Sequence, residues 1–390
     1  MMDIEKHRLE TPGSAHITHF NNAGASLMAK VVVDTMKNFI DLETRMGGYE
    51  AEASRSEDID RVYASIARLI RANPDEIAIT GNATQAWNAF FYSMRFEKDD
   101  EIITTISEYG SNYIALLQVA KKTGARIVNV RCDEDGMVSL DHLKKAFSKK
   151  TKLIAITHVP TNCGLIQPVA EVGKLARKAK VPFLLDACQS VGQLDIDVNA
   201  IGCDALTATG RKYLRGPRGT GFLYVNRRIV EKIEPSFLDN HSAKLVSLTE
   251  FAVRPDARRF ETWECSHTLK LGLGAAVDYL LTIGTKAVEE RVRYLAAKLI
   301  RSLSEHSKIM VHNVGSNQCG IVSFSVEGTD VAAIRRSLSG ANFNVSITTP
   351  ENTPLDLIHK QKGPLLRASL HYYNTEAEIE AFVKHLAGKH

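Results

Sequence analysis

The sequence predicts an α/β protein: a doubly wound, mostly parallel β-sheet followed by a smaller C-terminal α+β domain. Short apolar runs alternate with longer helical patterns through roughly the first 275 residues. These runs are nearly all apolar rather than alternating, which is typical of strands covered by helices on both faces. After that point, alternating strands and amphipathic helices follow. We therefore expect an N-terminal arm over 1–19, a large domain over 20–275 and a small domain over 276–390.

Seven apolar runs predict the strands of the large domain. In chain order they are EIAIT (76–80), DEIITTI (100–106), ARIVNV (125–130), TKLIAITHV (151–159), VPFLLDA (181–187), DALTAT (204–209) and GTGFLYV (219–225). Helical patterns begin at Ala83 and cover 111–122 and 168–179. Because parallel strands need long crossover connections, helices between strands support a parallel sheet.

The remaining elements predict the smaller domain. Two long helical patterns cover 271–284 and 286–306, and a further helix with a glycine stop covers 330–340. GIVSFSV (320–326) and LLRASL (365–370) are predicted strands, and the chain closes with an amphipathic helix in NTEAEIEAFVKHLAG (374–388). This mixture is typical of an α+β unit.

Composition narrows the class of function. The net charge is +4 over 390 residues, which gives no reason to expect nucleic acid or an anionic membrane as a partner. The six cysteines are scattered without a CxxC pair, so we expect neither a disulfide framework nor a metal site. No run is apolar and long enough to be a signal or membrane segment. We expect a cytoplasmic protein.

Polar residues follow the predicted strands at their carboxyl ends, where open α/β sheets bind ligands. Ala83 and Thr84 open a helix whose free N–H groups can hold an anion. The ring of Tyr109 can cover an aromatic ligand, and Asn162 offers an amide. Taken singly, these positions are better explained as a helix cap, a packing residue and a turn residue.

The predicted strands at 181–187 and 204–209 end in the most informative residues. Asp186 closes a wholly apolar strand in DACQ, where a buried carboxylate is costly unless a cation meets it or it caps a helix. Gln189 follows, and TGRK supplies Thr209, Arg211 and Lys212. Together with the earlier residues they provide an amine, a carboxylate, an anion cradle and an aromatic ring. Pyridoxal phosphate needs this set, with the lysine forming an imine.

These motifs resemble the class V aminotransferase family of fold-type I pyridoxal-phosphate enzymes, which includes cysteine desulfurases and selenocysteine lyases. The resemblance runs from FNNAGAS (20–26) to RASLHYYNTEAEIEAFVKHL (367–386). Thr209 to Lys212 resemble the family's Ser-x-His-Lys motif, and Asp186 to Gln189 its Asp-x-x-Gln motif. Ala83-Thr84 resembles its phosphate turn.

The resemblance implies a role for each residue. Lys212 would be the Schiff-base lysine and the proton shuttle, Asp186 would pair with the pyridinium nitrogen, and Tyr109 would stack on the ring. Gln189 and Asn162 would lie near the ring hydroxyl. The phosphate would be held by Ala83, Thr84, Thr209 and Arg211, and the substrate by Arg367 and Asn22. Family members are homodimers, so we expect one here.

Three departures from the family bear on activity. Desulfurases carry a nucleophilic cysteine on a loop before the last strand, but residues 342–369 contain no cysteine. Arg211 replaces the histidine beside the lysine. The segment 258–267 lacks the Gly-Thr-Pro that reaches the partner's phosphate, a contact for which Arg218 is a candidate replacement.

The stretches GGYEAE (47–52) and GRKYLRGPRGTG (210–221), with Tyr109, resemble the cysteine-desulfurase-like C–S lyases, such as the hercynylcysteine sulfoxide lyase of ergothioneine biosynthesis. We therefore expect β-elimination on an S-substituted cysteine or its sulfoxide, giving pyruvate, ammonia and a sulfur product. Lys212 would remove the α-proton, and Glu264 or Tyr49 would assist the departing group.

Other activities remain open at this point. A class V aminotransferase or an amino-acid epimerase would use the same lysine and carboxylate, whereas a cysteine desulfurase is disfavoured by the missing loop cysteine. A noncatalytic protein on the same fold is disfavoured by the intact Lys212–Asp186 pair. No G-x-G-x-x-G follows a first strand, which argues against a nicotinamide dehydrogenase. In every case we expect a small amino-acid substrate.

Overall fold

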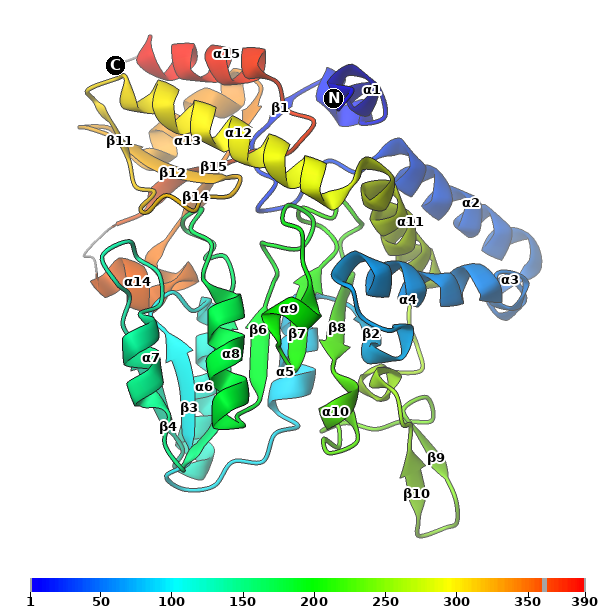
Figure 1. Cartoon of the computed structure of the whole chain (residues 1–390). Helices are drawn as coiled ribbons and strands as arrows, with labels where there is room; N and C mark the ends of the chain where they lie inside the picture. Colours follow the sequence, from blue (N-terminus) through cyan, green and yellow to red (C-terminus); the bar gives the residue numbers. More distant parts are fainter. Residues whose placement is uncertain (1, 360–362, 389–390) are drawn as a thin grey trace.

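A computed structural model describes residues 2–359 and 363–388. A seven-stranded sheet forms the lower part of the molecule in Figure 1, with strand order β2-β8-β7-β6-β5-β3-β4. Its strands are β2 (Ile77–Thr80), β3 (Glu101–Thr105), β4 (Arg126–Val130), β5 (Thr151–Thr157), β6 (Phe183–Asp186), β7 (Ala205–Thr209) and β8 (Gly221–Val225). Strand β8 is antiparallel to both neighbours, and all other pairs are parallel. The mostly parallel sheet is confirmed.

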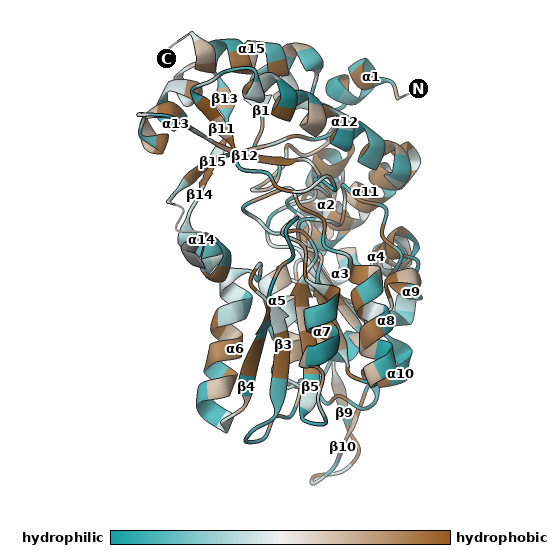
Figure 2. Ribbon diagram, turned by 60° about the vertical axis from the view of Figure 1, so that its left-hand side comes forward, coloured by the Kyte–Doolittle hydropathy of each residue, from teal (hydrophilic) through white to brown (hydrophobic). Residues whose placement is uncertain are grey.

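Helices cover both faces of this sheet (Figure 2). One face carries α5 (Ala83–Phe91) and α6 (Gly110–Thr123), and the other carries α7 (Leu140–Ala146) and α8 (Val169–Ala179). Successive strand residues enter opposite cores: Ile102 and Leu184 pack with α5 and α6, whereas Ile103 and Leu185 pack with the opposite core. Because side chains alternate along a strand and both faces of the inner strands are buried, those strands are mostly apolar, whereas the edge strand β4 is partly exposed and carries Arg126 and Asn129.

The C-terminal part contains a four-stranded antiparallel sheet of order β11-β12-β15-β14. Its strands are β11 (Ile309–Val311), β12 (Ile321–Val326), β14 (Ser346–Thr348) and β15 (Leu365–Ser369). Helices α12 (Thr285–Ser304), α13 (Val331–Gly340) and α15 (Glu376–Ala387) pack with it around one apolar cluster that includes Phe324 and Phe382. The smaller α+β unit is confirmed.

The N-terminal residues join this smaller sheet to the rest of the chain. After α1 (Ile4–Leu9), strand β1 (Thr18–His19) pairs in parallel with β13 (Phe343–Asn344). The following helices α2 (Lys30–Met46), α3 (Gly48–Ser54) and α4 (Ser56–Ile70) lie beside α11 (His267–Ile283), as Figure 1 shows. The predicted domain boundary after residue 275 falls inside α11. The position of the boundary between the two domains therefore stays a prediction.

A hairpin of β9 (Ala243–Leu245) and β10 (Phe251–Val253) projects from the large sheet at the lower right of Figure 1. The remaining short helices are α9 (Val198–Ile201), α10 (Arg227–Val230) and α14 (Pro354–His359). Within the described residues, no single helix has the length and apolarity to cross a membrane. Helices α11 and α12 have that length and apolarity only when taken together, and the pair is bent by 81°.

Candidate active site

A cavity of about 320 Å³ lies at the carboxyl ends of the parallel strands. It brings together most of the sequence-predicted site residues, from four separate segments of the chain. Those that line it are Ala83, Thr84, Tyr109, Asp186, Gln189, Thr209, Arg211 and Lys212. Ala83 and Lys212, which lie 129 positions apart in the chain, thus face one space, because these segments lie at the carboxyl ends of strands of the same sheet.

Lys212 follows β7 in a tight turn, in which the Gly216 N–H donates to the Gly210 carbonyl at 2.8 Å. Its side chain is buried, and burial lowers the pKa of the amine below its ordinary value. Cys188 and Asp186 oppose this shift, whereas Arg211 adds to it. A lowered pKa leaves more of the amine unprotonated, which is the form that bonds to an aldehyde.

Asp186 is the last residue of β6, and it is buried beside the same cavity. Its Oδ1 accepts the Cys188 N–H at 2.9 Å, and its Oδ2 accepts Asn112 Nδ2–H at 2.8 Å. Burial raises the pKa of this carboxyl, while these hydrogen bonds and Lys212 lower it. A ligand cation, such as a protonated ring nitrogen, would offset its burial.

An anion cradle lies where α5 begins. Asn82 caps the helix by accepting the Gln85 N–H at 2.8 Å, which leaves the N–H groups of Ala83 and Thr84 without helical partners. Thr209 and Arg211 also line this cavity. A helix N-terminus, a hydroxyl and a guanidinium together form a site suited to a phosphate group.

The two predicted amides differ in position. Gln189 lines the cavity and donates to the Ala23 carbonyl at 3.2 Å and to Thr161 Oγ1 at 3.1 Å, while its Oε1 has no partner in the described residues. Asn162 does not line the cavity, and its Nδ2 donates to Asp356 Oδ2 at 2.6 Å. An unpartnered buried oxygen beside the cavity fits a ligand with a hydrogen-bond donor.

Of the two predicted substrate-binding residues, Arg367 lies nearer the chemistry. It is buried on β15, where Nη1 donates to the Thr161 carbonyl at 2.9 Å and Nε to Ser346 Oγ at 3.0 Å. Burial lowers the pKa of Arg367 to about 10. Its charge acts on the Lys212 amine, and Thr161 lines the cavity. Arg367 does not itself line the cavity but contacts Thr161, which does, and a buried guanidinium in this place can bind a carboxylate.

Asn22 is not brought to the cavity. Its Nδ2 donates to the Ser369 carbonyl at 2.8 Å, and its Oδ1 accepts the Tyr373 hydroxyl at 2.6 Å. The side chain is fully buried, so its hydrogen bonds tie the N-terminal segment to β15 rather than face a substrate. The sequence alone could not predict these hydrogen bonds, because Ser369 and Tyr373 are distant from Asn22 in the chain.

Three further predicted residues lie away from the cavity. Arg218 and Glu264 are exposed, and Glu264 lines a separate space of about 180 Å³. Tyr49 on α3 is 73% exposed. Conversely, the sequence analysis missed several lining residues, namely Asn82, Asn112, Thr157, Val159, Thr161 and Cys188. Asn112 had a detectable signal, since it and Glu108 are polar residues in the stretch that follows β3, where the other site residues were sought.

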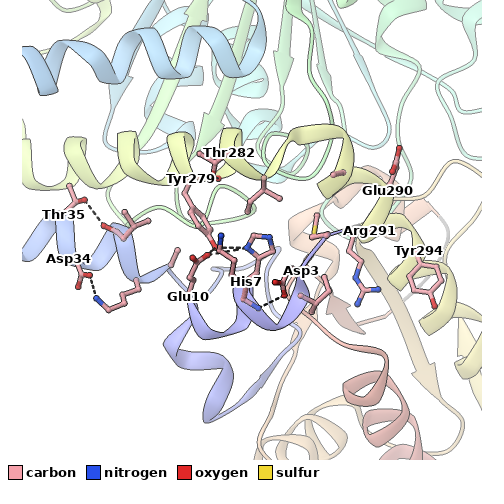
Figure 3. A pocket seen from close by; sticks show the side chains of 18 of the residues that line it. Asp3, His7, Glu10, Asp34, Thr35, Tyr279, Thr282, Glu290, Arg291 and Tyr294 are labelled. Atoms are coloured by element: carbon pink, nitrogen blue, oxygen red, sulfur yellow. Dashed lines mark hydrogen bonds and ion pairs between the residues drawn. The ribbon is translucent and has the colours of Figure 1, made fainter.

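A larger cavity of about 1520 Å³ lies between α1, α2, α11 and α12 (Figure 3). Figure 3 shows His7 and Glu10 of the N-terminal segment meeting Tyr279 of α11, with 3.1 Å between His7 Nδ1 and the Tyr279 hydroxyl. None of the sequence-predicted site residues lines it. The larger cavity is therefore not the candidate active site, because the predicted amine and carboxylate line the smaller one.

Comparisons with known proteins agree with this geometry. The sequence model described as "Aminotransferase class-V" matches residues 18–382. A probable cysteine desulfurase of Synechocystis is 30% identical over 95% of this chain and 90% of its own, and one of Halalkalibacterium halodurans is 32% identical over 95% and 92%. The solved structure of a cysteine desulfurase from Thermococcus onnurineus superposes with a TM-score of 0.92 at 26% identity, covering 100% of this chain and 98% of that one.

These relatives contradict the predicted C–S lyase activity. The curated relatives and this solved structure are named cysteine desulfurases, the activity that the missing loop cysteine had disfavoured. The prediction was wrong because it gave one absent residue more weight than similarity over the whole chain. The connection to ergothioneine biosynthesis depended on the lyase resemblance and is not carried further.

Proposed function

The chain belongs to the class V aminotransferase family, whose cofactor is pyridoxal phosphate, and from that premise we propose that it is a cysteine desulfurase. Such an enzyme moves the sulfur of L-cysteine to a thiol and releases L-alanine. The relatives named above support this substrate. The observation that carries the proposal is that a buried amine, Lys212, and a buried carboxylate, Asp186, line one cavity.

The residues of this cavity fit the cofactor. The N-terminus of α5, Thr209 and Arg211 would hold its phosphate, and Asp186 would accept a hydrogen bond from its ring nitrogen. The unpartnered Oε1 of Gln189 faces the same space. Bound pyridoxal phosphate supplies a ring that withdraws electrons from the substrate α-carbon.

The protein groups then have defined tasks in the reaction. Arg367 binds the α-carboxylate of L-cysteine, because it is a buried cation within electrostatic reach of Lys212. The Lys212 amine, whose pKa burial lowers, takes the proton from the α-carbon and later returns a proton to the product. With the cofactor bound, Asp186 would hold a proton at the ring nitrogen.

The sulfur acceptor distinguishes this chain within the family. Residues 342–369 contain no cysteine, and burial raises the pKa of the Cys188 thiol, so Cys188 stays protonated and is a weak nucleophile. We therefore assign the acceptor role to an external thiol. L-cysteine and two thiols then give L-alanine, hydrogen sulfide and one disulfide, which balances atoms and electrons.

The test is an assay of purified protein with pyridoxal phosphate, L-cysteine and dithiothreitol. We expect equal amounts of L-alanine and sulfide, at a rate that rises with dithiothreitol concentration. Cys188→Ala should keep most of this activity. Pyruvate and ammonia in place of alanine would contradict the desulfurase proposal, and loss of turnover in Cys188→Ala would contradict the external acceptor.

We also propose that the protein is a cytoplasmic homodimer that acts on a small amino acid and not on nucleic acid or a membrane. Apolar side chains exposed on and near the β9–β10 hairpin support a protein contact there. They are Phe237, Leu245, Val246, Leu248, Phe251 and Trp263. Sedimentation velocity of the wild type and of Leu248→Asp would test it, with a shift from dimer to monomer expected in the variant.

A further inference from the structure

Glu108 is a fully buried carboxylate that the proposed reaction does not use. It accepts hydrogen bonds from Thr157 Oγ1 at 2.6 Å, the Tyr109 N–H at 2.8 Å, Thr104 Oγ1 at 2.9 Å and Asn112 Nδ2 at 2.9 Å. Among the described residues, the charged group with the largest effect on Glu108 is Asp186, and no cation is among the main causes of its pKa shift. A carboxylate that is buried without a cation is costly to keep, so its position calls for an explanation.

Asn112 links Glu108 to the cofactor site. Its Nδ2 lies 2.9 Å from Glu108 Oε1 and 2.8 Å from Asp186 Oδ2, so one NH2 group bridges the two carboxyls. All three side chains are buried. Because both hydrogens are engaged, Asn112 cannot rotate to turn its carbonyl oxygen toward Asp186 without losing both bonds.

The two carboxyls also interact directly through their charges. Burial, with a smaller contribution from Asp186, raises the pKa of Glu108 to about 7, against the hydrogen bonds that Thr157 and Asn112 donate. Two neighbouring carboxylates disfavour each other's ionised form, whereas a cation beside either one stabilises both. A protonated ring nitrogen at Asp186 would be such a cation.

We propose that Glu108 is a positioning residue for the cofactor, which acts through Asn112 to orient the Asp186 carboxylate toward the ring nitrogen and to strengthen that contact. The proposal rests on the pyridoxal-phosphate site and not on which amino acid is the substrate. It distinguishes Glu108 from a carboxylate that merely ties α6 to β3 and β5, because a structural tie would not depend on the ring nitrogen.

The test compares the binding of two ligands in the absence of any amino acid. One is pyridoxal phosphate, and the other is its carbocyclic analogue with C–H in place of the ring nitrogen. We expect Glu108→Gln to weaken binding of pyridoxal phosphate about tenfold. This is the lower end of the range for a residue that acts on a ligand through another side chain. Binding of the analogue should change by less than about twofold. Equal losses for both ligands, or no loss for either, would overturn the proposal.

Two further variants complete the experiment. Asn112→Ala should give the same selective loss, and Glu108→Gln should add nothing to it, because both changes break one chain of contacts. This variant decides the matter if Glu108→Gln does not fold. Asp204→Asn is the matched control, since Asp204 is a buried carboxylate that accepts the Phe183 N–H at 2.9 Å at the other end of the strands. Any change in affinity that Asp204→Asn causes should be the same for both ligands. Absence of desulfurase turnover would leave this binding result unaffected, so the two proposals fail separately.

Discussion

At the residue scale, two buried lysines of this chain have different surroundings. Lys212 faces the cavity beside the Cys188 thiol, whereas Lys270 on α11 donates to the Tyr63 hydroxyl at 2.6 Å and lies 4.5 Å from the centre of its ring. The first amine is available to a ligand, and the second is engaged in packing.

We therefore expect Lys212→Ala to abolish the absorbance band at about 420 nm that pyridoxal phosphate acquires on bonding to a lysine. Lys270→Ala should keep the band, although the folded state will be less stable. The measurement is a visible spectrum after addition of the cofactor and removal of its excess by dialysis. A band that survives in Lys212→Ala would exclude Lys212 as the bonding lysine.

Arg367 permits a second prediction at this scale. Arg367→Lys keeps the charge but loses the planar pair of donors that matches a carboxylate. We expect KM for L-cysteine to rise by about tenfold or more, with the affinity for pyridoxal phosphate unchanged. Initial rates against cysteine concentration, together with a cofactor titration, test this. An equal loss of cofactor affinity would instead indicate that Arg367 supports the cavity as a whole.

At the element scale, the segment 349–359, which follows β14, packs closely against the start of α6. A side-chain carbon added to Gly110 would lie 2.2 Å from the Glu351 carbonyl oxygen, so only glycine permits this approach. The segment also brings Asp356 to Asn162. It lies where the family resemblance implied a cysteine-bearing loop, and its contacts with α6 hold it beside Tyr109.

We expect Gly110→Ala to displace this segment and to lower the free energy of unfolding by about 1–3 kcal/mol, the usual cost of an overpacked contact. Gly48→Ala is the matched control, because Gly48 also begins a helix and an added carbon there meets nothing within 4 Å. Thermal unfolding and limited proteolysis at 349–359 would measure the difference. Equal behaviour of the two variants would show that the close contact is absent in solution.

At the scale of the whole molecule, buried histidines make stability depend on pH. His158 follows β5 and is buried, and burial with the charge of Arg293 lowers its pKa to about 4 from 6.5. The unfolded chain takes up a proton below pH 6.5 that the folded protein accepts only near pH 4. The contribution to stability is therefore complete above pH 6.5 and is lost as the pH falls toward 4. His371, whose pKa burial also lowers, acts in the same direction.

We expect the free energy of unfolding to fall between pH 6.5 and 4, by up to about 3 kcal/mol for His158 alone. His158→Asn should flatten this slope, whereas the exposed His16→Asn should not. Urea denaturation at several pH values would measure it. Identical slopes in wild type and His158→Asn would contradict the assignment.

The arrangement of the whole molecule explains which elements the sequence predicted correctly. The seven apolar runs became the strands β2 to β8 within one or two residues at most ends, because burial on both faces leaves a signal inside each run. The β9–β10 hairpin and the α14 segment gave no such signal. Their residues are exposed or depend on a neighbouring element, so local composition did not mark them.

The sequence by itself therefore determined the doubly wound sheet, the smaller α+β unit and the cofactor, because apolar runs and residues at strand ends are local properties of the chain. Only the tertiary structure decided which polar groups share a space. It joined Asn112 to Asp186 across 74 positions and to the buried Glu108, and it took Asn22 away from the cavity. Those contacts depend on strand order and helix packing, and no short stretch of sequence encodes the distance between two segments that meet only after folding.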